Sequence, residues 1–169
     1  MPDTIDGRAA NGALFVLRRA ARADARALAE LRAVSLAEQD HLETPQHDAF
    51  VRDAERAFAR LADDGKLAAW LLCDGAAVLG SACAVYFDRL PYADGSLHAE
   101  VSGVYVRPAY RGRGFASRLL RHVMDDVRAS GARKTFLRPA SKARALYARL
   151  GFVDDTTGVM SLTTRGDEA

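Results

Sequence analysis

The sequence predicts an α/β fold built on a mixed sheet, and two observations lead to that prediction. Between residues 66 and 106, apolar runs are separated by short turn-forming stretches, the first of them at Asp74-Gly75, which is typical of antiparallel strands. Residues 97–138 then have the pattern strand, helix, strand, and such a connection joins parallel neighbours through a right-handed crossover. The expected sheet is therefore mostly antiparallel, with one parallel pair.

The individual elements follow from hydrophobic periodicity. Strands are expected where aliphatic and aromatic residues run together or alternate: 13–20, the two arms of 66–87, 97–106, 133–139 and 158–162. Helices are expected where apolar residues recur every three or four positions: 23–39, 48–65, 115–127 and 141–151. Residues 1–12 are rich in Gly, Asn and Asp and are expected to be a flexible tail, whereas 13–169 are expected to form a single domain.

The bulk composition excludes several classes of protein. Lys and Arg number 24 against 22 Asp and Glu, and a net charge of +2 argues against a protein that coats nucleic acid. Apolar runs are all too short to span a membrane. Cys73 and Cys83 lie in apolar runs without metal-ligand spacing, so we expect reduced core cysteines, no metal and a cytoplasmic location.

The stretch VRPAYRGRGFASRLL, residues 106–120, places glycines and arginines between the strand at 97–106 and the helix that follows. The first amides of a helix have no partners within it, and the helix dipole makes them partly positive, so they can bind a phosphate. Glycines at 112 and 114 would let such a ligand approach the backbone. Alone, this motif fits an anion site and a simple tight turn equally well.

A second motif makes the reading more specific. The run YVRPAYRGRGFA resembles the acyl-CoA signature [Q/R]-x-x-G-x-[G/A] of the GNAT superfamily of N-acetyltransferases, with Arg111, Gly114 and Ala116 at its defined positions. Downstream, ARALYARLGF at 143–152 resembles the A-x-x-L-Y-x-x-L-G-F helix and turn of the same family. The resemblance is close over residues 66 to 163, and it implies a GNAT-like fold with a splayed parallel strand pair and about four helices.

The resemblance also implies a cosubstrate, acetyl-CoA. By position, the residues that would bind its pyrophosphate and pantetheine are Val104, Tyr105, Val106, Arg111, Gly112, Arg113, Gly114, Phe115, Ala116 and Ser117. An extended amide chain can add to a strand edge where two parallel strands separate. The sequence departs from the family at Ala140, where many members carry an asparagine.

Acetyl transfer to an amine needs a base and an acid, because only about one alkyl amine in a thousand is neutral at pH 7. Glu100 is the expected base, since some family members place a glutamate at the same offset from the motif, with His98 as a weaker substitute. Tyr147 is the expected acid that protonates the departing thiolate. Each residue also has a plain structural reading: Glu100 on the solvent face of a strand, and Tyr147 in an apolar core.

The function expected from these motifs is direct transfer of an acetyl group from acetyl-CoA to a primary amine of a small molecule or peptide. The alternatives are a non-catalytic acyl-CoA-binding module, a transferase of another acyl group, and a nucleic-acid binder using the arginines of 107–121, against which the near-neutral charge argues. The polar stretches 40–48, with His41 and His47, and 88–97 are expected to select the acceptor. A homodimer is suggested only by family analogy.

Overall fold

The computed structural model describes residues 3–8, 14–92 and 95–154 of the chain. It forms two compact units, Met1–Arg138 and Pro139–Ala169. The first unit holds the sheet and the three long helices, and the second holds one short helix. That residues 13–169 form a single domain stays a prediction.

The first unit is built on a six-stranded sheet whose spatial order follows the chain, from β1 to β6. Its first four pairings are antiparallel and the last, β5 with β6, is parallel, which confirms the predicted mixed sheet. The strands are β1 Asp3–Arg8, β2 Leu14–Arg19, β3 Leu67–Asp74, β4 Ala77–Tyr92, β5 Gly95–Val106 and β6 Lys134–Phe136.

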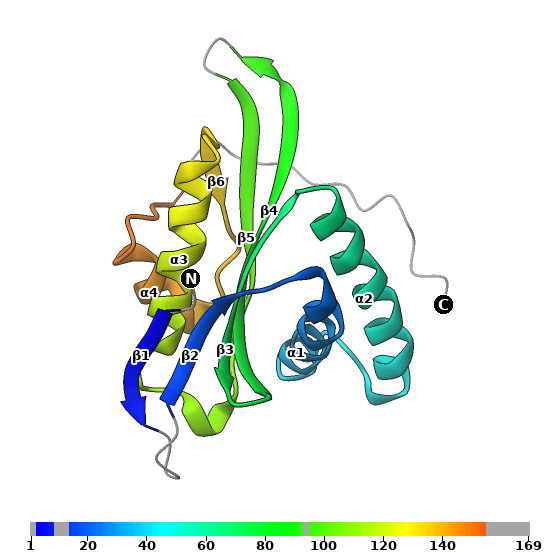
Figure 1. Cartoon of the computed structure of the whole chain (residues 1–169). Coiled ribbons are helices and arrows are strands. Elements are labelled where there is room, and N and C mark those ends of the chain that lie inside the picture. The colour runs from blue at the N-terminus through cyan, green and yellow to red at the C-terminus, as the bar shows by residue number, and fades with distance from the viewer. Residues whose placement is uncertain (1–2, 9–13, 93–94, 155–169) are drawn as a thin grey trace. The chain divides into compact units, whose positions relative to one another are not determined.

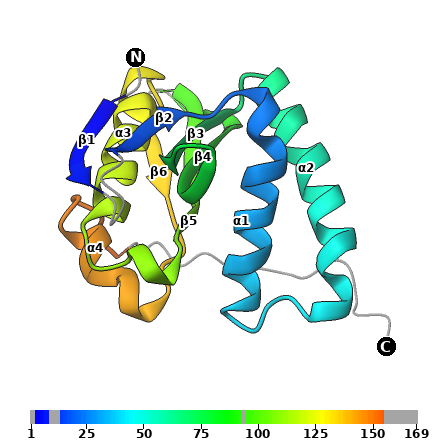
Figure 2. The same cartoon turned by 60° about the horizontal axis from the view of Figure 1, so that its bottom comes forward.

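Helices cover both faces of this sheet. Figures 1 and 2 show α1 and α2 on one face and α3 on the opposite face. The α-helices within the described residues are α1 Ala25–Ala37, α2 His47–Asp63, α3 Phe115–Ala129 and α4 Arg144–Ala148, the last lying in the second unit. None of the described helices is long and apolar enough to cross a bilayer.

The burial pattern explains this layered arrangement. Six consecutive residues of β3, from Ala68 to Cys73, are buried, as expected for a central strand covered on both faces. On the α1 side, Leu28 packs with Leu71 and Cys83. On the α3 side, five residues of the predicted apolar stripe are buried, and the sixth, Met124, is half-buried; the five are Phe115, Leu119, Leu120, Val123 and Val127.

The structure differs from the sequence prediction at the N-terminus. Strand β1 forms within the segment predicted as a flexible tail and pairs antiparallel with β2, for example Thr4 with Val16. Its sequence, DTIDGR, has no apolar alternation, so its pairing relies on the backbone edge that β2 offers.

The other differences concern element lengths. The predicted irregular stretch 88–97 is largely strand, because β4 continues to Tyr92 and β5 begins at Gly95. The predicted helix 141–151 is shorter, with a 3₁₀ turn at Ser141–Ala143 followed by α4. The predicted strand 158–162 lies outside the described residues.

Candidate functional site

The loop between β5 and α3 has a backbone that requires its glycines. Gly112 and Gly114 adopt φ values of +78° and +76°, in the left-handed region that other residues rarely occupy. A Cβ added at either position would meet no atom of the described chain within 4 Å. These glycines therefore serve the backbone conformation and leave open space beside the loop.

The start of α3 has amides without helical partners. Gly114 is the N-cap residue, and no side chain accepts a hydrogen bond there. The first amide bonded in the helical manner is that of Arg118, which donates to the Gly114 carbonyl at 3.2 Å. The amides of Phe115, Ala116 and Ser117 precede it, so they can bind an anion that approaches over the glycines.

The side chain of Arg111 is turned away from this role. Its Nε donates to the Val106 carbonyl at 2.8 Å, and its Nη2 donates to Glu38 Oε2 at 2.5 Å. Arg111 therefore closes the loop against the end of β5, and the carboxylate of Glu38 balances its charge. Arg113, by contrast, is exposed and lies over the Tyr110 ring at 5.8 Å.

Glu38, the residue after α1, is a site residue that sequence analysis missed. Its Oε1 accepts a hydrogen bond from the Tyr105 hydroxyl at 2.6 Å. Burial raises the pKa of Tyr105 to about 12, and the hydrogen bond to Glu38 adds to the rise. Glu38 thus joins the end of α1 to both β5 and the glycine loop. Because 73 positions separate it from Arg111, no local signal could have found it.

The edge of β5 that faces β6 is mostly open. Parallel pairing covers three positions, His98 with Lys134, Ala99 with Thr135 and Glu100 with Phe136. From Val101 to Val106, no strand within the described ranges pairs with this edge. The predicted contact residues Val104, Tyr105 and Val106 lie on this open stretch, which leads directly to the glycine loop.

A β-bulge interrupts β5 in the same stretch. The register with β4 shifts between Ser81 and Cys83, and Gly103 has a φ of +61°. The Ser81 hydroxyl donates to the Gly103 carbonyl at 2.9 Å and holds the bulge. A bulge bends the strand and re-aims the side chains beyond it, so that Tyr105 faces α1.

Glu100 lies at the last parallel pairing, before the open edge begins. Its neighbours Ala99 and Val101 are buried on the α3 side, whereas Glu100 pairs with Val85 on the face covered by α1. The Glu100 side chain is 42% exposed, and its Oε1 lies 4.0 Å from Arg138 Nη1. It is therefore an accessible carboxylate on the same face as Tyr105.

His98, the substitute base, is part of the core. It is 1% exposed, and its ring stacks on Phe136 with centroids 5.7 Å apart. Burial, together with the positive charges of Arg89, Arg133 and Lys134, lowers the pKa of His98. The neutral ring therefore serves the packing of the β5–β6 pair.

The second unit holds Tyr147 within a helix C-cap. The amide of Phe152 donates to the Tyr147 carbonyl at 3.1 Å, and that of Gly151 donates to the Ala148 carbonyl at 3.0 Å. With Gly151 at a φ of +90°, this is a Schellman motif, and the ring contact between Tyr147 and Phe152, 6.0 Å between centroids, is its usual apolar contact. Burial raises the pKa of the Tyr147 phenol. The LYARLGF sequence therefore has a structural explanation alongside any catalytic one.

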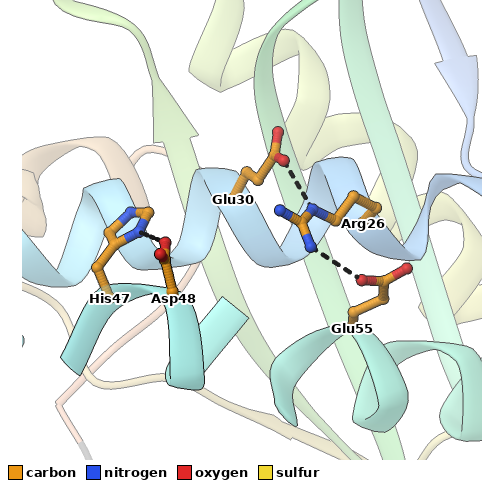
Figure 3. Close-up of polar contacts among 5 residues, drawn as sticks. All are labelled: Arg26, Glu30, His47, Asp48 and Glu55. Atoms are coloured by element: carbon orange, nitrogen blue, oxygen red, sulfur yellow. Dashed lines mark hydrogen bonds and ion pairs between the residues drawn. The ribbon is translucent and has the colours of Figure 1, made fainter. Parts of the chain in front are cut away.

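The segment between α1 and α2 was the expected source of acceptor contacts. Within α2, His47 Nδ1 lies 3.4 Å from Asp48 Oδ1 (Figure 3). Arg26 of α1 donates hydrogen bonds to Glu30 of the same helix and to Glu55 of α2 (Figure 3). Of these pairs, only the exposed one between Arg26 and Glu55 joins the two helices. Within the described part of the chain, no three His, Cys, Asp or Glu residues are grouped to hold a metal ion.

The site therefore combines an open strand edge, a glycine loop and uncapped helix amides. The Glu100 carboxylate lies where the open edge begins. The sequence model of the acetyltransferase (GNAT) family matches residues 24–152, so the chain belongs to this family, whose members transfer an acyl group from acyl-CoA. No curated protein matches the chain.

Solved structures share the fold at low sequence identity. A predicted acetyltransferase from Clostridium acetobutylicum, solved with acetyl-CoA, is 18% identical, with a TM-score of 0.78 over 88% of this chain and 96% of that one. A GCN5-related N-acetyltransferase from Ralstonia eutropha is 17% identical, with a TM-score of 0.74 over 88% and 98%. Glucosamine-6-phosphate N-acetyltransferase from Arabidopsis thaliana is 14% identical, with a TM-score of 0.66 over 89% and 99%. These similarities confirm the predicted GNAT-like fold.

Proposed function

We propose that this protein is an acetyl-CoA-dependent N-acetyltransferase that transfers the acetyl group directly to a primary amine while both substrates are bound. The observation that carries the proposal is the continuity of β5. This strand carries Glu100 and then an unpaired edge, and the chain continues from it into the glycine loop and the first amides of α3. A carboxylate that can deprotonate the amine, a strand edge for an extended amide chain and an anion site thus follow one another along the chain.

The cosubstrate fits each part of this series. The pantetheine amides add as a pseudo-strand along Val104, Tyr105 and Val106, and the pyrophosphate binds at the loop from Arg111 to Ser117. Two neighbours of the same fold act on amines according to their names, the glucosamine-6-phosphate N-acetyltransferase and an aminoglycoside acetyltransferase from a soil metagenome. This analogy supports an amine acceptor at the level of fold only.

Glu100 acts as the base in this proposal. It removes a proton from the acceptor ammonium, directly or through water, so that the neutral nitrogen can attack the thioester carbonyl. A C–N bond forms and the C–S bond breaks. Within the described ranges, the accessible Glu100 carboxylate forms a single ion pair, with the exposed Arg138 at 4.0 Å. Such a long, solvated pair leaves the carboxylate available to an amine.

Tyr147 supplies the proton that the departing thiolate takes up. A phenol is protonated at neutral pH, and burial raises the pKa of Tyr147 further, so the proton is present when negative charge develops on the sulfur. The family motif around Tyr147 supports this role, and the aromatic contact with Phe152 fixes the ring orientation within its own unit.

The first test is a calorimetric titration of the purified protein with acetyl-CoA, with dephospho-CoA as the comparison. We expect saturable binding of one molecule per chain. A folded sample, free of co-purified CoA, that shows no binding at high micromolar acetyl-CoA would remove the central claim.

The second test measures thiol release with a panel of amines. Tyr147→Phe and Glu100→Gln should each lower kcat by about 10²- to 10⁴-fold, the usual contribution of a general acid or base. Glu55→Gln, an exposed carboxylate bound to Arg26 on the outer helix pair, is the matched control and should leave kcat unchanged. Acetyl-CoA binding without transfer to any amine would instead favour a non-catalytic binding module.

A further inference from the structure

Helix α1 places one arginine on its sheet-facing side. Leu28 packs against Leu71, Cys73 and Cys83 of the sheet, and Arg32 follows one helical turn later on the same side. The flanking residues Leu31 and Ala33 are almost fully buried, at 1% and 0% exposure. The Arg32 side chain itself is half-buried. A half-buried arginine thus lies on the side of α1 that packs against the sheet, whose same face carries Glu100.

Arg32 has no anionic partner within residues 3–8, 14–92 and 95–154. This distinguishes it from Arg26 on the same helix, which binds both Glu30 and Glu55, and from Arg111, which binds Glu38. In the sheet, the charge of Arg32 acts on Cys83, where burial raises the pKa to about 12 and that charge offsets part of the rise. That thiol is therefore neutral at pH 7 and supplies no counter-charge. A half-buried charge without a partner is unfavourable, and an anionic ligand would offset that cost.

The sheet register places Glu100 on the face of the sheet that α1 covers. Cys83 pairs with Ser102, and Glu100 pairs with Val85, so Cys83 and Glu100 are diagonal neighbours on one face. Diagonal neighbours across antiparallel strands lie about 7–8 Å apart. Arg32, on the helix that covers this face, and Glu100 therefore present opposite charges on the same side of the sheet, as recognition of the anion and the amine of one small molecule requires.

We propose that Arg32 binds an oxyanion of the acceptor, so that the preferred acceptors are small primary amines that also carry a carboxylate or a phosphate. The inference rests on the proposed function, since it assigns the acceptor of the same reaction. Arg111 cannot take this role while Glu38 balances its charge. Because Arg32 is remote from the breaking bond, it contributes to acceptor binding and not to the chemical step.

The test uses amine pairs that differ in the anion alone, with acetyl-CoA and thiol release as the assay. Two pairs carry a carboxylate, glycine with glycinamide and 4-aminobutyrate with butylamine. Two carry a phosphate, O-phosphoethanolamine with ethanolamine and glucosamine-6-phosphate with glucosamine. We expect the anionic member of at least one pair to have a kcat/KM at least tenfold higher, and the pair that responds distinguishes carboxylate from phosphate.

The variant Arg32→Met keeps the apolar stem and removes the charge. It should raise the KM of the preferred anionic acceptor about 10- to 100-fold, the range for loss of a charge-assisted hydrogen bond, with kcat and the neutral partner's kinetics unchanged. Arg32→Lys should recover part of the loss. Arg52→Met is the matched control, because Arg52 is an exposed helical arginine with no recorded ion pair inside the described segments.

Three outcomes would overturn the inference. The first is equal acetylation of the neutral and the anionic members, the second is a preference for anions that survives in Arg32→Met, and the third is no acetylation of any anionic amine. In each case the proposed function is judged separately, by acetyl-CoA binding and by transfer to neutral, polycationic or peptide amines. Loss of acetyl-CoA binding in the wild-type protein would instead overturn the proposed function.

Discussion

The two ends of α3 carry glycines with nearly the same backbone conformation and opposite surroundings. Gly114 at the start and Gly131 just beyond the end have φ values of +76° and +74°, and a Cβ at either would meet nothing within 4 Å. The polar groups at the C-terminal end are satisfied by the chain itself. The Ser130 hydroxyl donates to the Val127 carbonyl at 2.7 Å and accepts from the Ala132 amide at 3.2 Å, and the Gly131 amide donates to the Arg128 carbonyl at 3.2 Å.

The N-terminal end has no such closure, because its N-cap residue makes no side-chain hydrogen bond. A left-handed glycine therefore indicates a ligand site only when the amides beside it lack partners. The difference lies in hydrogen bonding and not in backbone conformation, which makes the two ends matched controls for each other.

The largest expected effect on acetyl-CoA affinity comes from substituting these glycines. Gly114→Ala and Gly131→Ala should each lower the free energy of unfolding by about 1–2 kcal/mol, because alanine is strained in the left-handed region. Only Gly114→Ala should also weaken acetyl-CoA binding, by tenfold or more, since the strained loop moves its amides and the added methyl group occupies ligand space. Denaturant unfolding and calorimetric titration of both variants measure the two quantities. Equal loss of acetyl-CoA affinity in both would refute a site at the N-terminal end.

The next effect concerns the ion pairs near the two ends. Glu38→Gln should destabilise the protein by about 1–3 kcal/mol, because it weakens the charge-assisted bonds from Arg111 and Tyr105. It should also weaken acetyl-CoA binding, because Arg111 no longer holds the loop against the Val106 carbonyl as firmly. Chemical denaturation and titration check both effects. Unchanged acetyl-CoA affinity, with reduced stability, would make Glu38 a structural residue only.

A third effect is the response to alkaline pH. Tyr105 has a folded-state pKa of about 12, raised from the value of about 10 expected in the unfolded chain. The contribution of this protonated phenol to the free energy of unfolding is complete below pH 10. It is lost as the pH rises toward 12, because the unfolded chain releases the proton first. The loss amounts to at most about 2–3 kcal/mol. Tyr105→Phe should flatten the fall in stability over this window, with the remainder due to Tyr86 and Tyr147, whose pKa values burial also raises. A pH dependence identical to that of the wild type would contradict the assignment.

The smallest effect is expected at the C-terminal end of α3. Arg128 and Asp125 form an exposed pair there, 2.7 Å apart, with side chains 65% and 70% exposed. Asp125→Asn should change the free energy of unfolding by less than about 0.5 kcal/mol and leave acetyl-CoA affinity unchanged, because surface pairs are screened by water and salt. Thermal unfolding with and without acetyl-CoA measures both. A large loss of ligand-induced stabilisation would mean that the anion site extends along the helix.

The region best predicted from the sequence is the unit from β5 through α3. The apolar stripe from Phe115 to Val127 specified the helix, and the glycines specified the loop that precedes it. Both signals are local, since helical periodicity and left-handed glycines depend on a few consecutive residues. The strand β1 was missed for the complementary reason that its pairing comes from β2 and not from its own pattern.

The sequence by itself determined the order of the elements from β2 to α4, the mixed sheet and the family motifs, because these follow from short-range patterns. Only the tertiary structure decided which side chains meet. It brought Glu38 to Arg111 and Tyr105, placed Arg32 on the side of α1 that packs against the sheet, and ended the β5–β6 pairing after three positions. Such contacts join segments tens of residues apart, and the packing of helices on the sheet selects them. The open edge and the opposed charges that give the site its expected chemistry are therefore products of the fold.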